Sequence, residues 1–474
     1  MGLALVCALQ GCGRDPAPAP AGRLIRQSGQ CFPQSVTRAL DLLLVIDNSP
    51  SMAGESARLG AQLDALVQAL ASIRFGFPDA HIGVISTDVG TGSSAVAGCT
   101  ETGDAGRLLR QPRSDCQPPD GAYLDITNWD AVLRGNVPDA DASGEIEVSD
   151  IQAALRCVGL LGAGGCGYEQ PLEAALRALT CTETECPNSG FLRPEAVLVV
   201  VFITDEDDCS ASSDVVFDPD LPTEGGCRCF DLGVTCTASG CEPNEESTVV
   251  HPVQRYYDFL SRLKPAGRVI VGAVTGPFAP GAIVDTTTDA QGNCVLVPSC
   301  TRDTEAGFPA VRIADLVRRF AEYGVMLSDD DGAGICGDDY SPVLARLGGY
   351  HGGHAAGCIS EPLVRADGAI VEEPADAICV VTEVNDDGRR DLQRCVFMGA
   401  APLACPYDES PGAVVEAPCW YLCDEGPAEL GGCEYRWMMR TCREPTCAPY
   451  VAARPYTDDC INCLTCDPLA PGCE

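Results

Sequence analysis

The chain has few basic side chains and little histidine. Its 474 residues include 31 Lys and Arg against 68 Asp and Glu, which gives a formal net charge of −37, and only four histidines. Nucleic-acid-binding proteins and polybasic membrane contacts both need Lys and Arg to neutralise phosphates. The composition therefore argues against nucleic acid and against an electrostatic membrane contact, whereas so negative a field helps to gather cations.

Long apolar runs and enzyme motifs are also missing. No stretch approaches the ~20 apolar residues that a transmembrane helix needs. The sequence contains no Gly-x-Ser-x-Gly elbow, no Walker loop and no dinucleotide fingerprint on a strand–helix turn. We therefore expect a binding or structural protein and not an enzyme.

Cysteine, by contrast, is abundant. Thirty cysteines are too many for a reducing compartment unless they bind metal, and four histidines are few for a shared zinc role. Disulfide bonds and export are therefore expected. If a signal peptide containing Cys7 is removed and Cys12 is acylated, the number of remaining cysteines is even, which allows complete pairing.

The N-terminal residues favour export. Residues 1–11 form a short apolar segment of the kind found in signal peptides. The run Leu-Gln-Gly-Cys12 resembles the processing site of a bacterial lipoprotein, in which Cys12 carries the lipid. A simple cleaved signal with an incidental Cys12 is the alternative. We expect the Pro- and Ala-rich residues 12–35 to be a tether. The expected location is the cell envelope, at the outer membrane, with the lipid anchor as the only membrane contact.

Strand and helix patterns alternate through residues 36–355. The apolar runs predict buried strands at 42–46, 81–86, 196–203 and 268–274, and the helical periodicities predict helices at 55–72, 149–161, 171–179, 253–263, 313–323 and 340–347. This alternation indicates an α/β fold with a doubly wound, mostly parallel sheet flanked by helices. The Gly-, Pro- and Cys-rich segments 89–138 and 209–250 are expected to be cysteine-braced insertions.

The last part of the chain, residues 356–474, has no clear periodicity and is rich in cysteine. We expect a disulfide-rich C-terminal region that its hydrophobic content alone would not stabilise. Full pairing requires at least one disulfide to cross the boundary near residue 356, because each side holds an odd number of mature cysteines. Proximity in the sequence suggests Cys336 with Cys358.

Two polar motifs follow predicted strands directly. Asp47, Ser49 and Ser51 lie between strand 42–46 and its helix, and Asp205 follows strand 196–203 in the pair Thr-Asp. The carboxyl ends of parallel strands form the crevice where α/β sheets bind ligands, and hard oxygen donors suit Mg²⁺, Mn²⁺ or Ca²⁺. In this context the motifs resemble the metal-ion-dependent adhesion site of the von Willebrand factor type A (VWA) domain family.

The resemblance implies a VWA-like domain over residues 36–355. Asp47, Ser49, Ser51 and Asp205 would hold Mg²⁺, or Mn²⁺ or Ca²⁺, and an open position would take a carboxylate of a protein ligand. The family usually supplies a Thr from the middle loop, where this chain has Glu169. Glu169 either substitutes as a direct or water-mediated ligand, or takes no part.

The function implied is cation-dependent binding of a protein or other carboxylate-bearing ligand at the cell envelope. The alternative is a structural, disulfide-stabilised envelope protein with a degenerate metal site. The other polar groups are interpreted as acidic rims, loop contacts or disulfides rather than separate metal sites; they are Thr87-Asp88, Asp207-Asp208, His351 with His354, residues 383–394, and Cys460 with Cys463 and Cys466.

Overall fold

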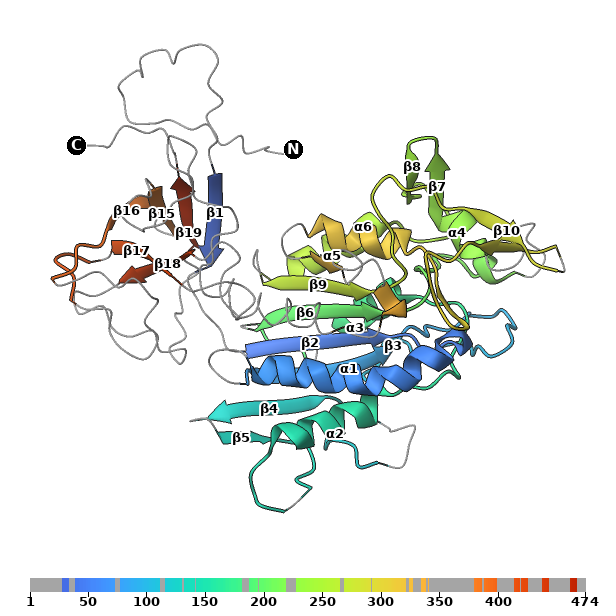
Figure 1. Ribbon diagram of the computed structural model, residues 1–474, viewed down its shortest axis with the longest axis horizontal. Helices are drawn as coiled ribbons and strands as arrows, with labels where there is room; N and C mark the ends of the chain where they lie inside the picture. The colour runs from blue at the N-terminus through green and yellow to red at the C-terminus, as the bar shows by residue number, and fades with distance from the viewer. Residues whose placement is uncertain are drawn as a thin grey trace, which may run out of the picture.

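The computed structural model contains two separate larger sheets (Figure 1). It describes residues 28–33, 39–72, 77–110, 116–129, 132–140, 142–180, 187–194, 196–218, 227–264, 268–290, 292–320, 324–326, 334–337, 340, 379–385, 388–398, 413–417, 419–424, 437–442 and 461–466. Among these residues, no helix combines the length and the apolar character needed to cross a membrane.

The larger sheet has seven strands and is mixed. Its strands, in spatial order, are β14 (Gly324–Met326), β9 (Val269–Val274), β6 (Val197–Ile203), β2 (Ala39–Ile46), β3 (Asp79–Ser86), β4 (Leu124–Trp129) and β5 (Val132–Gly135). The five strands from β14 to β3 are parallel, whereas β4 pairs antiparallel with β3, and β5 pairs antiparallel with β4. Four predicted buried strands are thereby confirmed as β2, β3, β6 and β9.

Helices cover both faces of this sheet (Figure 1). These helices are α1 (Ala53–Ala71), α2 (Val148–Gly159), α3 (Pro171–Thr180), α5 (Val253–Leu263) and α6 (Val311–Arg319). The chain also forms the short helix α4 (Arg228–Gly233) and the 3₁₀ turns η1 (Pro50–Met52), η2 (Asp214–Phe217) and η4 (Gly334–Cys336). Alternate side chains of β2 explain the two layers, because successive residues of a strand face opposite sides. Leu42 and Leu44 pack in the core with α1 and α2, and Leu43 and Val45 pack in the core with α3, α5 and α6.

Residues 89–138, predicted to be an insertion, also contribute two strands to the main sheet. This segment includes β4 and β5, which extend the main sheet. Its two cysteines pair outward, Cys99 with Cys166 and Cys116 with Cys157 of α2, so the segment is fastened to the rest of the domain. The predicted helix 340–347 lies outside the described residues except for Tyr340.

The later insertions form small hairpins. They are β7 (Val234–Thr237) with β8 (Gly240–Pro243), β10 (Thr286–Thr288) with β11 (Cys294–Leu296), and β12 (Cys300–Arg302) with β13 (Glu305–Gly307). Their disulfides are Cys209–Cys229, Cys227–Cys294, Cys236–Cys241 and Cys300–Cys336. The proposed pairing of Cys336 with Cys358 is therefore wrong, because Cys336 forms its disulfide with Cys300 of the β12–β13 hairpin.

The second sheet combines both ends of the chain. Its order is β1 (Ser28–Pro33), β19 (Ile461–Cys466), β15 (Cys379–Asn385), β16 (Gly388–Arg394), β17 (Cys419–Asp424) and β18 (Trp437–Cys442). β1 comes from the stretch expected to be a tether and pairs antiparallel with β19. One described disulfide, Cys395–Cys419, joins β17 to the residue that follows β16.

Candidate functional site

The candidate site lies where β2 and β6 end side by side. The two strands pair in parallel up to Ile46 and Ile203, and the Asp47 N–H donates to the Ile203 carbonyl (2.9 Å). The residues that follow the two strands therefore emerge at one edge of the sheet. The structure brings Asp47 and Asp205 to this edge, as their positions after parallel strands predict.

Neutral donors hold the Asp47 carboxylate in place. The Ser49 N–H donates to Oδ1 (2.8 Å), the Thr204 hydroxyl donates to Oδ2 (2.7 Å), and the Thr87 hydroxyl lies 3.4 Å from Oδ1. Asp47 is fully buried. Three strand ends, those of β2, β3 and β6, thus converge on one carboxylate. Thr87, interpreted from the sequence as part of an acidic rim, is buried and makes one of these contacts.

A chain of hydroxyl groups links the first motif to the second. The hydroxyl oxygens of Ser49 and Ser51 are 2.8 Å apart, and the Ser51 hydroxyl donates to Asp205 Oδ1 (3.1 Å). Ser51 is solvent-exposed, whereas Ser49 and Asp205 are buried. Two carboxylates and two hydroxyls therefore lie together, and the group opens to solvent at Ser51.

The loop that precedes α3 delivers Glu169 to the same region. The Glu169 carbonyl accepts from the Cys209 N–H (2.8 Å), and the Gln170 N–H donates to the Thr87 carbonyl (3.0 Å). The Glu169 carboxyl is buried and hydrogen-bonds that of Glu206. Burial, then the charges of Glu206 and Asp47, raise the pKa of Glu169 well above its usual range. Glu169 is thus beside the group, in contact with an acid that sequence reasoning did not select.

The carboxyl groups at this edge repel one another. Burial, followed by the charges of Asp47 and Glu206, raises the pKa of Asp205 to about 9. Burial and the charge of Asp47 raise the pKa of Glu206 to about 7. Removing such groups from water disfavours their charged forms, and a cation among them favours those forms. Protons or a cation must therefore balance the carboxylates.

Two buried side chains next to the group also lack hydrogen-bond partners. Glu55, in the first turn of α1, is 1% exposed, and neither of its carboxylate oxygens has a hydrogen-bond partner. The same is true of both polar atoms of the Asn48 side chain. Orphaned oxygens beside hard oxygen donors are compatible with a bound Mg²⁺, which usually keeps several waters. Glu55 was not selected from the sequence, although its position as an acidic residue in the first turn of a helix is a signal that marks it.

The candidate donor set mixes carboxylates and hydroxyls in equal number. Within the described ranges, no three His, Cys, Asp or Glu side chains are grouped closely enough to hold a metal ion. Asp47, Ser49, Ser51 and Asp205 supply two carboxylates and two hydroxyls, all oxygen ligands of the type that suits Mg²⁺. These four residues would hold the cation, which would polarise an oxygen of a bound ligand.

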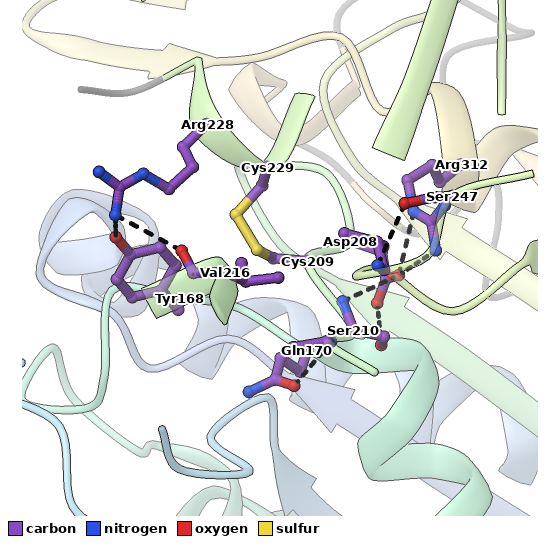
Figure 2. Close-up of a disulfide and its surroundings, with 12 residues drawn as sticks. Tyr168, Gln170, Asp208, Cys209, Ser210, Val216, Arg228, Cys229, Ser247 and Arg312 are labelled. Atoms are coloured by element: carbon purple, nitrogen blue, oxygen red, sulfur yellow. Dashed lines mark hydrogen bonds and ion pairs between the residues drawn. A yellow bond between two sulfur atoms is a disulfide. The ribbon is translucent and has the colours of Figure 1, made fainter. Parts of the chain in front are cut away.

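The acids after Asp205 anchor the loop and are not a solvated rim. Asp207 accepts from the N–H groups of Arg312 (2.9 Å) and Ile313 (3.2 Å) at the start of α6. Asp208 pairs with the fully buried Arg312 (2.9 Å) and accepts from the Ser210 hydroxyl (2.5 Å), as Figure 2 shows. These contacts fix the loop that carries Asp205.

Disulfides fasten the loops on both sides of the group. Cys209, four residues after Asp205, pairs with Cys229 of α4, and Figure 2 shows this bond beside Tyr168 and Arg228. Cys166, three residues before Glu169, pairs with Cys99. Of the remaining motifs, His351, His354 and Cys460 lie outside the described residues, whereas residues 383–385 and 388–394 lie in the paired strands β15 and β16.

Comparisons with known proteins assign no family. No family model and no curated protein matches the chain. Three similar solved structures are each 10% identical to this chain. Proximal thread matrix protein 1 from the mussel byssus has a TM-score of 0.23, and the match covers 52% of this chain and 40% of that chain. The pilus adhesin SpaC from Lactobacillus rhamnosus GG in an open conformation has a TM-score of 0.25 with coverages of 93% and 40%, and the pilus adhesin RrgA from Streptococcus pneumoniae has a TM-score of 0.21 with coverages of 93% and 58%. The chain spans less than two thirds of the length of each. At these TM-scores the likenesses carry no argument.

The raised pKa of Asp205 predicts that the metal-free protein loses stability as the pH rises. A carboxyl with a higher pKa in the folded than in the unfolded state stabilises the fold fully below its unfolded value, here near 3.8, and loses this contribution as the pH rises through the folded value of about 9. Thermal unfolding in EDTA, followed from about pH 5 to about pH 9, should therefore show a falling melting temperature. In Asp205→Asn the melting temperature should depend less on pH. If it falls with pH as steeply in this variant as in the parent, Asp205 is not the group responsible.

The buried pair of Arg312 with Asp208 predicts a large loss of stability when one partner is removed. Arg312→Met leaves Asp208 buried without its cation and should lower the free energy of unfolding by about 3–5 kcal/mol. Arg319→Met is the matched control on the same helix, because Arg319 is 23% exposed and pairs with Asp315 and Glu245. Arg319→Met should lower the free energy of unfolding by about 1 kcal/mol or less. Denaturant unfolding with the disulfides intact measures the free energy of unfolding of each variant. Equal losses in Arg312→Met and Arg319→Met would contradict the larger contribution of the buried pair.

Proposed function

We propose that the chain is an exported cell-envelope protein that binds a carboxylate-bearing protein ligand through a divalent cation. The domain is a VWA-like, doubly wound α/β domain, and Asp47, Ser49, Ser51 and Asp205 hold Mg²⁺, or Mn²⁺ or Ca²⁺. The protein acts by binding and not by catalysis. The lipid at Cys12 anchors it to the outer membrane.

The strand order supports a doubly wound domain. If β2, β3, β4, β6, β9 and β14 are numbered one to six, the sheet reads 3-2-1-4-5-6, and the direction of winding reverses between β2 and β6. In open α/β sheets, ligands bind outside the carboxyl ends of the strands at such a reversal. Asp47 and Asp205 follow the two strands that flank it.

The single observation that carries the proposal is the contact between the two motifs. The Ser51 hydroxyl, 154 residues before Asp205 in the sequence, lies 3.1 Å from the Asp205 carboxylate and 2.8 Å from the Ser49 hydroxyl. Hydroxyl and carboxylate oxygens at these separations can share one small cation. The exposed position of Ser51 leaves the group accessible to an oxygen from a partner.

The disulfides support export. The described residues contain six disulfides in the α/β domain, and two of them fasten loops next to the candidate site. Disulfides at this density persist in oxidising compartments such as the periplasm and the cell surface. A Pro- and Ala-rich segment after Cys12 supports a tethered, envelope-bound form.

Cation titration tests the proposal. The oxidised protein should bind Mg²⁺, Mn²⁺ or Ca²⁺ in isothermal titration calorimetry, whereas Asp47→Ala and Asp205→Ala should lose at least about tenfold in affinity, as expected when a ligand or its support is removed. Asp64→Ala is the matched control, because Asp64 lies on α1 and pairs with Arg156 away from the sheet edge. If both site variants bind all three cations as the parent does, the proposal is wrong. Ligand capture with and without a chelator then identifies the partner.

A further inference from the structure

A carboxylate of the chain itself lies beside the candidate cation site. Glu305, on the β12–β13 hairpin, forms an ion pair with Arg58 of α1. Its carboxyl also lies against Gly54, so closely that a Cβ at Gly54 would collide with it. Gly54 is in the first turn of α1, three residues after Ser51, which is about 5 Å along a helix axis. Glu305 therefore lies against the first turn of α1, close in the chain to Ser51.

Arg58 is oriented toward this place by its neighbours. Helical side chains point toward the helix N-terminus, so the Arg58 guanidinium reaches back toward the first turn of α1. Its Nη2 lies 3.5 Å from the Ile335 carbonyl and 3.9 Å from Glu55 Oε1. η4, which includes Ile335, is joined to the hairpin by Cys300–Cys336. Arg58 is thus held between an acid of its own helix and an acid of the hairpin.

The hairpin is also connected to the site backbone. The Phe308 N–H, directly after β13, donates to the Asp205 carbonyl (2.7 Å), and the Ile335 N–H donates to the Thr275 carbonyl at the end of β9 (3.0 Å). Glu305 consequently has a defined position relative to Asp205.

The ion pair is suited to exchange. Arg58 and Glu305 are each 19% exposed, and ion pairs with access to solvent contribute little to stability. A ligand carboxylate that brings its own binding energy could therefore displace Glu305. In the ligand-free protein, Glu305 is a tethered competitor with a high effective concentration.

We propose that Arg58 is a second contact for an acidic ligand and that Glu305 occupies it until the ligand binds. This inference rests on the proposed cation-dependent function. The ligand class is a polypeptide segment with two carboxylates, one for the cation and one for Arg58. Glu305 lowers the affinity of the free protein for such segments and has no effect on those with a single carboxylate.

The test uses capped peptides with two aspartates separated by a glycine spacer of increasing length, and a matched set in which the second aspartate is asparagine. Binding to the full, oxidised chain is measured with saturating Mg²⁺. Glu305→Gln should raise the affinity for the best two-aspartate peptide about fivefold, the effect of losing a competing ion pair, and leave the asparagine set unchanged. Arg58→Gln in that background should remove the gain.

Asp303→Asn is the matched control, because Asp303 is an exposed acid in the same hairpin turn and its replacement makes the same change in net charge. It should not raise the affinity. Melting temperatures and Mg²⁺ affinities of the variants show that each is folded and that the cation site is intact. The inference is overturned if Glu305→Gln leaves the two-aspartate affinity unchanged or lowers it while Mg²⁺ still binds, or if Asp303→Asn produces the same gain. If the parent binds no cation, the proposed function fails, and this inference fails with it.

Discussion

The burial of one carboxylate, that of Asp47, is the constraint on which the arrangement of the sheet edge depends. Its hydrogen bonds come from Ser49, Thr87 and Thr204, all neutral donors. A buried charge without a positive partner costs free energy, so the fold must supply a proton or admit a cation. The ends of β2, β3 and β6 all provide groups to this carboxylate, and the loop before α3 adds a further acid.

The surrounding loops can be long because covalent bonds hold them. The loop after β6 is fixed by Cys209–Cys229 and by the Arg312–Asp208 pair, and the loop before α3 is fixed by Cys99–Cys166. The Cys209 N–H also bonds the Glu169 carbonyl, so the two loops restrain each other. This restraint opposes the mutual repulsion of the acids, which by itself would drive these loops apart. The oxidised state is therefore part of the site's construction.

Much of this edge could be predicted from the sequence, because parallel strands bring their carboxyl ends together. That rule placed Asp47 beside Asp205 without knowledge of the intervening loops. The same rule could not show that Glu206 meets Glu169, since this contact depends on the conformation of two loops.

Contacts between distant insertions were beyond prediction for a similar reason. β4 and β5 lack long apolar runs, and they extend the sheet by antiparallel pairing at an edge. Cys336 pairs with Cys300 because a hairpin brings them together, whereas sequence proximity favoured another partner. The ion pair of Arg58 with Glu305 joins residues 247 positions apart, and no local pattern marks it.

The most direct measurement is the position of a bound cation. Crystals of the oxidised protein grown with Mn²⁺, which scatters anomalously, would locate the ion independently of any binding assay. The account predicts an anomalous peak at about 2.0–2.4 Å from Ser49 and Ser51 hydroxyl oxygens, with the Asp47 and Asp205 carboxylates as direct or water-mediated ligands. A fully occupied Mn²⁺ elsewhere, with none between these four residues, would contradict it.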